Sequence, residues 1–131
     1  QGVSSAASDV YKRQMNRLPV LERTYDFLKW LVPAITQFPR QQRFLLGERI
    51  ESAALDLLDL LVEARLTPET RAAVLRRALV RVDRLTYLLR LSHDLELLSG
   101  SRYEYGCRVL DEVSRQVGGW MRAGAQREAV R

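Results

Sequence analysis

The stretch 24–63 constrains the fold of this chain most strongly, because it is the most apolar part and carries one clear break. Before the break, apolar residues recur at steps of three and four, the spacing that places side chains on one face of an α-helix. Pro39 forms the break, since proline disfavours helical geometry in the preceding residue and suits the first turn of a new helix. We predict a first helix over about 19–38, with a core stripe of Leu21, Tyr25, Leu28, Val32 and Ile35.

The second helix of this stretch has an apolar arc wider than the roughly 100° that a surface helix needs to contact one core. Its stripe consists of Leu46, Ile50, Ala53, Ala54, Leu57, Leu58 and Leu61, and it is flanked by Phe44, Leu55 and Val62. The surplus apolar area predicts a second buried contact, either with another helix of the bundle or with another subunit.

Trp30 falls nearly opposite the core stripe predicted for the first helix. An indole in that position is either an ordinary exposed aromatic or an interface anchor, and aromatic residues are enriched in interfaces. Because the second helix also has apolar area to spare, we favour the anchor. The predicted oligomer interface therefore contains Trp30, Phe44, Leu55 and Val62.

Two further helices follow with clear boundaries. Thr67 is the expected N-cap of the third helix, with Pro68 at its first position. Gly100 is expected to end that helix in the left-handed conformation, and Ser101 with Glu104 forms a capping box for the fourth. The predicted core residues are Leu75, Ala78, Leu79, Val82, Leu85 and Leu89, then Tyr103, Leu110, Val113, Val117 and Met121.

Four helices joined by short turns, without strand-like alternation, predict an all-α fold, an antiparallel up-and-down four-helix bundle over 15–123. Residues 1–14 are polar, aperiodic and begin with Gln. We expect them to be a non-native or disordered extension that precedes a natural start at Met15. Residues 124–131 follow the weakening pair Gly118 and Gly119 and are expected to form a flexible tail.

The basic residues are unusual because 19 of the 21 are arginine, in a chain with a formal charge of +5. Helical phase places two rows of arginines on the outside: Arg77, Arg81 and Arg84 on the third helix, and Arg108, Arg115 and Arg122 on the fourth. Such rows can neutralise nucleic-acid phosphates without reading bases. The alternatives are surface pairing with nearby carboxylates and an arginine-rich coding bias.

The residues give little sign of catalysis, metal binding or a cofactor. His93 is the single histidine and Cys107 the single cysteine, so we expect a packed, hydrogen-bonded histidine and a buried, inert thiol. No apolar run approaches the roughly 20 residues of a membrane span, and no signal sequence is evident. We expect a cytoplasmic protein that is not an enzyme.

Three blocks, residues 24–64, 87–99 and 103–120, resemble the accessory variability determinant (Avd) proteins of diversity-generating retroelements, most specifically in the run FPRQQRFLLGERIE at 38–51. The resemblance implies a non-enzymatic subunit that forms a pentameric, positively charged barrel and binds the retroelement's reverse transcriptase and nucleic acid. The assembly supports synthesis of adenine-mutagenised complementary DNA from a template RNA, as part of mutagenic retrohoming.

Two alternatives remain at this point. The same bundle family includes the proteins encoded in ribosomal RNA intervening sequences, which would make this chain a scaffold or interaction protein without a polymerase partner. A small bundle enzyme or metal protein is motivated only by His93 with Glu96.

Overall fold

The computed structural model describes residue 6 and residues 18–130 of the 131-residue chain, and within them the long elements are all helices. Helix α2 spans Pro19–Thr36. After the break at Phe38 and Pro39, one helical run is made of α3, Arg40–Gln42, a π-helical turn, Arg43–Gly47, and α4, Glu48–Leu66. A 3-10 turn, Pro68–Thr70, leads into α5, Arg71–Asp94, and α6 spans Gly100–Val130.

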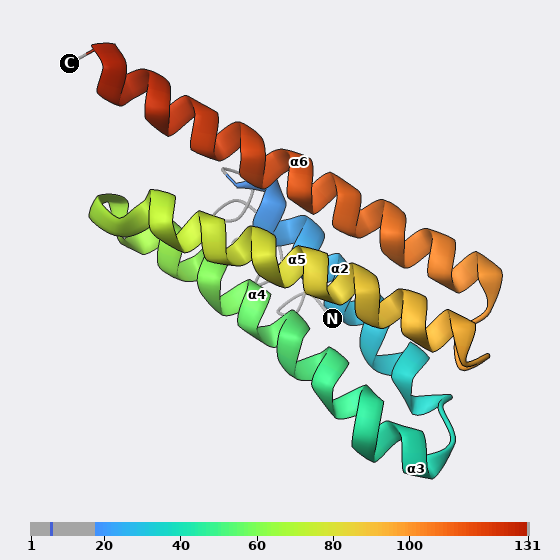
Figure 1. Ribbon diagram of the computed structural model, residues 1–131. Helices are drawn as coiled ribbons and strands as arrows, with labels where there is room; N and C mark the ends of the chain where they lie inside the picture. The colour runs from blue at the N-terminus through green and yellow to red at the C-terminus, as the bar shows by residue number, and fades with distance from the viewer. Residues whose placement is uncertain (1–5, 7–17, 131) are drawn as a thin grey trace.

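The four long helices form a bundle in which each packs against its neighbours in the chain and α6 returns to α2 (Figure 1). Short turns connect them, so sequential neighbours run antiparallel, as predicted. The turn between α2 and α4 lies at the same end of the bundle as the turn between α5 and α6. The turn between α4 and α5 lies at the other end, beside the C-terminal part of α6 (Figure 1).

The core of α4, α5 and α6 follows the predicted periodicity. Ile50, Leu57, Leu61, Leu75, Leu85, Leu89, Leu110, Val113 and Val117 are all at most 1% exposed. Leu58, Leu79, Tyr103 and Met121, also predicted in the core, are partly buried against it. The wide arc of the second helix is therefore explained in part by contacts within the bundle.

The predicted core stripe of the first helix is correct only in part. Leu21 and Ile35 are buried and Leu28 is partly buried, but the centre of the stripe is shifted by about one residue. Tyr25 and Val32 are 47% and 46% exposed, whereas Thr24, Phe27 and Leu31 are at most 1% exposed. Thr24 hides the true stripe because it is polar, yet its hydroxyl donates to the carbonyl of Val20 at 2.8 Å and can be buried without loss.

The turn between α5 and α6 differs from the predicted one. Helix α5 ends at Asp94, and Glu96, with φ of 63°, takes the left-handed position expected for Gly100. The N–H of Leu97 donates to the carbonyl of Ser92 and that of Glu96 to His93, which is the bonding pattern of a Schellman motif. Gly100 is instead the first residue of α6.

The caps of the third and fourth helices also differ from prediction. Ser99, rather than Ser101, caps α6, because its hydroxyl accepts from the N–H of Arg102 at 3.3 Å. Thr67 does precede the restart at Pro68, but its hydroxyl donates backwards to the carbonyl of Glu63 at 2.6 Å. The restart itself is a single 3-10 turn before α5 begins.

The end of the bundle at the α4–α5 turn is held by Arg71. Its guanidinium donates to the carbonyls of Ala64 at 2.7 Å and Arg65 at 3.2 Å, which caps the last turn of α4. The same group lies 5.3 Å from the ring centre of Trp120 on α6, a cation–π contact. One side chain thus ties α4, α5 and α6 together.

Helix α6 continues to Val130, beyond the boundary predicted near Ala123. Flexibility of the segment 124–131 stays a prediction. The expected non-native or disordered segment 1–14 lies outside the described residues except for residue 6.

Candidate nucleic-acid interface

The arginines predicted on α5 lie along the groove between α5 and α4. Arg77 pairs with Glu63 at 3.6 Å and Arg81 pairs with Asp56 at 3.9 Å, both across that groove. Arg84 is exposed and makes no ion pair with any described residue. Pairs this long and this exposed contribute at most about 1 kcal/mol. They do, however, place a carboxylate where a phosphate would have to bind.

The arginines predicted on α6 also include two that form ion pairs and one that does not. Arg108 pairs with Glu104 at 3.2 Å and Arg115 with Asp111 at 3.3 Å, in both cases one helical turn away. Arg122 has no carboxylate partner among the described residues. The two rows do not meet, because Arg77 and Arg81 reach α4 whereas Arg108 and Arg115 pair within α6.

A third group of arginines was not singled out from the sequence. Arg40 and Arg43 in the run before α4, and Arg49 in its first turn, are exposed and form no ion pair with any described residue. Phe44 and Leu45 lie among them and are 61% and 60% exposed. The available signal was the segment 38–47, which contains two arginines, three large apolar residues besides Phe38, and no acidic residue.

A groove of about 430 Å³ runs from this group toward α5. Phe44, Leu45 and Arg49 line it from the α4 side, and Arg84 lines it from α5. Glu48 and Asp56 also line it, and Asp56 is the partner of Arg81. The groove therefore combines an exposed aromatic ring with arginines that lack partners in the described structure.

The residues predicted for an oligomer interface differ in exposure. Phe44 and Leu55 are exposed, at 61% and 52%, and Val62 is partly buried. Trp30 does not lie opposite the core as predicted. It is partly buried, with its ring centre 5.3 Å from that of Tyr105 on α6 and 5.7 Å from that of Phe27. A one-residue error in the phase of α2 explains the difference. The place of Trp30 in an oligomer interface stays a prediction.

Gly106 makes room for the Trp30 indole. A Cβ atom at Gly106 would lie 2.9 Å from the Trp30 ring and 2.8 Å from Leu89 Cδ1. Gly106 thus allows the partly buried Trp30 ring to pack closely against α6.

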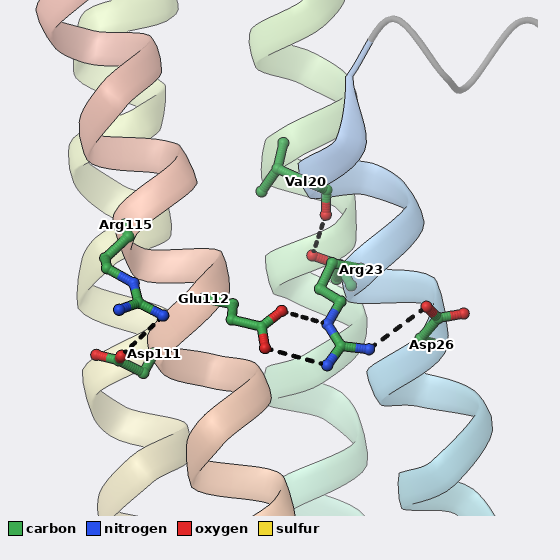
Figure 2. Close-up of polar contacts among 7 residues, drawn as sticks. Val20, Arg23, Asp26, Asp111, Glu112 and Arg115 are labelled. Atoms are coloured by element: carbon green, nitrogen blue, oxygen red, sulfur yellow. Dashed lines mark hydrogen bonds and ion pairs between the residues drawn. The ribbon is translucent and has the colours of Figure 1, made fainter.

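Arg23 and Glu112 form the main polar contact between α2 and α6 (Figure 2). Arg23 Nε donates to Glu112 Oε2 at 2.7 Å and Nη2 to Oε1 at 3.3 Å, while Nη1 lies 3.6 Å from Asp26. The hydrogen bond from Arg23 lowers the pKa of Glu112, helped by the nearby arginine charges, and it raises the pKa of Arg23. This pair joins α2 to α6, and it occupies the Arg23 guanidinium.

His93 and Cys107 behave as structural residues. The His93 ring stacks on Tyr103, with ring centres 4.8 Å apart, and its Nδ1 lies 3.1 Å from the carbonyl of Leu98. Burial raises the pKa of the Cys107 thiol, which disfavours the reactive thiolate. The prediction of a packed, hydrogen-bonded histidine is confirmed. Cys107 is half-buried rather than buried as predicted, and its lack of reactivity stays a prediction.

The fold and the site define a four-helix bundle whose basic residues are nearly all arginine. A family model described as bAvd-like matches residues 18–123, and the chain belongs to this family, the bacterial accessory variability determinants. A search of curated protein sequences gives no match. Within the described residues, every helix is too short or too polar to cross a lipid bilayer.

Proposed function

We propose that this chain is a non-enzymatic accessory subunit of a diversity-generating retroelement, which binds the reverse transcriptase and nucleic acid in the cytoplasm to support mutagenic retrohoming. The observation that carries the proposal is the family match, which covers nearly the whole bundle. The arginine-rich surface supports it, because guanidinium groups suit phosphate contacts. In this role the protein needs neither a metal nor a cofactor of its own.

The proposal includes self-assembly into a ring, with five copies as the number that the family resemblance suggests. Leu55 supports a contact outside the bundle, because it is a large apolar side chain on α4 that is 52% exposed. Such a ring would repeat each basic surface around a common axis and add up the positive potential.

The polymerase arm is tested by co-expression with the reverse transcriptase encoded beside this gene, followed by affinity purification through a tag on the polymerase. Co-purification that survives nuclease treatment and moderate salt is the expected result. A polymerase that is recovered without this chain contradicts the proposal and favours a bundle scaffold of the ribosomal intervening-sequence type.

The assembly arm is tested by native mass spectrometry of the purified chain and of the variant Leu55→Glu. A closed oligomer that dissociates in Leu55→Glu is expected. Leu66→Glu is the matched control, because Leu66 is 67% exposed but lies at the end of α4 outside the predicted interface. A monomer at micromolar concentration would contradict self-assembly.

A further inference from the structure

We infer that the Arg40–Arg43–Phe44 surface, defined as Arg40, Arg43, Phe44, Arg49 and Arg84, binds single-stranded nucleic acid by stacking a base on Phe44 and neutralising the adjoining phosphates. This inference rests on the proposed function, in which the chain binds nucleic acid. It deepens that function by naming the surface and the strand state, and it moves the contact away from Arg77, Arg81, Arg108 and Arg115.

The π-helical turn creates the surface. The N–H of Glu48 donates to the carbonyl of Arg43, five residues back, which adds one residue to the turn. Leu46 and Gly47 are buried, and Gly47 approaches α2 so closely that a Cβ there would lie 2.7 Å from Ile35 Cγ2. With these two residues anchored, Phe44 and Leu45 are left on the outside.

The exposure of Phe44 has no explanation in the packing of the chain. Phe44 is 61% exposed, and its ring makes no aromatic or cation–π contact with another described residue. A free aromatic face is what single-stranded nucleic-acid proteins use as a stacking platform, because every base has a π-face.

The charges around Phe44 suit phosphate. Arg40 lies one helical turn before it and Arg43 is its neighbour, while Arg49 and Arg84 share the groove with it. None of these four arginines forms an ion pair with a described residue, in contrast to Arg77, Arg81, Arg108 and Arg115. A phosphate can therefore bind them without first displacing a carboxylate.

The carboxylates of the groove indicate on which side of Phe44 the phosphates bind. Glu48 lines the groove one turn after Phe44 and would repel a phosphate there. Phosphates are therefore expected on the Arg40 and Arg43 side, with a base against Phe44. A duplex cannot present an unstacked base face in this way, so the surface favours single strands.

The test measures fluorescence anisotropy of a labelled oligouridine and of an RNA duplex with the same number of phosphates, over a series of salt concentrations. Phe44→Ala is expected to weaken oligouridine binding about tenfold and to leave duplex binding unchanged. Leu45→Ala is the matched control, since Leu45 is adjacent and equally exposed at 60% but has no ring. It should change binding by less than about twofold.

The charge arm compares two double variants that each remove two arginines. Arg40→Gln/Arg43→Gln is expected to weaken oligouridine binding about tenfold or more and to reduce the salt slope by about 1.4, as for two single-strand phosphate contacts. Arg77→Gln/Arg81→Gln should have an effect several times smaller. Helical circular dichroism and unfolding curves confirm that all variants are folded.

Each alternative outcome contradicts either this inference alone or the proposed function as well. If the wild-type chain binds neither probe, both this inference and the nucleic-acid arm of the proposed function fail. If it binds and only Arg77→Gln/Arg81→Gln weakens binding, this inference fails while the proposed function stands. Equal losses of oligouridine and duplex in Phe44→Ala overturn base stacking. Loss of the polymerase with unchanged RNA binding assigns the surface to a protein partner and overturns the inference.

Discussion

The two ends of the bundle use an aromatic ring and arginines in opposite ways. At the α4–α5 end, Arg71 is bonded to two backbone carbonyls and lies on the Trp120 ring, which itself packs against the core. At the end with the π-helical turn, Phe44, Arg40 and Arg43 are exposed and make no such contact with any described residue. The same residue types hold the fold together at one end and are free for a ligand at the other.

The first prediction compares the two aromatic residues, where the expected difference is largest. Trp120→Ala should lower the free energy of unfolding by about 2–3 kcal/mol, because it removes a ring that is partly buried against the core. Phe44→Ala should change it by no more than about 0.5 kcal/mol. Urea unfolding followed by circular dichroism measures both, and similar losses would contradict the contrast between the ends.

The second prediction compares the arginines. Arg71→Ala should lower the free energy of unfolding by about 1–2 kcal/mol, since two backbone carbonyls lose a charged donor. Arg43→Ala should change it by less than about 0.5 kcal/mol. Arg71→Lys is the useful intermediate, because a single ammonium cannot reproduce the fork of the guanidinium. Full stability of Arg71→Ala would show that this end is not tied by Arg71.

The third prediction concerns the α5–α6 turn, which lies at the same end as the π-helical turn. Glu96→Gly should raise the free energy of unfolding by about 0.5–1 kcal/mol, because glycine adopts the positive φ without strain. Gly100→Ala should be neutral or stabilising, since Gly100 is in the first turn of α6 and a Cβ there meets only His93 Cε1 at 4.0 Å. A clear loss of stability in Gly100→Ala would restore the left-handed Gly100 that the sequence suggests.

The smallest effect on the free energy of unfolding is expected at the ion pair of Arg23 and Glu112, which lies between the two ends of the bundle. Because folding lowers the pKa of Glu112, its contribution to stability is complete above the unfolded value of about 4.3 and is lost as the pH falls through the folded value. The difference in unfolding free energy between the wild type and Glu112→Gln should therefore shrink below about pH 4. A difference that does not vary with pH would mean that the carboxylate charge is unimportant.

The sequence predicts α4, α5 and α6 well because their apolar residues keep one helical phase throughout. Ile50, Leu57, Leu75 and Leu110 are buried as the spacing requires. It succeeds only in part for α2, where Leu21 and Ile35 are buried as predicted but Tyr25 and Val32 are exposed, because the buried Thr24 interrupts the true stripe. Trp30 was misplaced as a consequence.

The candidate site was predicted only in part, for a physical reason. Helical phase places Arg77, Arg81, Arg108 and Arg115 on the surface. It also places Glu104 and Asp111 one turn before Arg108 and Arg115, but it cannot show that Arg77 and Arg81 pair with carboxylates on α4. Phe44 lies in the π-helical turn, where Gly47 packs closely against Ile35 of α2. Neither local pattern nor composition contains that contact.

The most direct test asks whether nucleic acid binds at the Arg40–Arg43–Phe44 surface rather than at the paired arginines. A bromouridine-containing single strand is photo-crosslinked to the wild-type chain, and the attachment sites are mapped by mass spectrometry. The crosslinked nucleotide should be attached to Phe44 or its immediate neighbours in the π-helical turn. Attachment at Tyr87 of α5 or Trp120 of α6, with none in the segment 40–49, would contradict it.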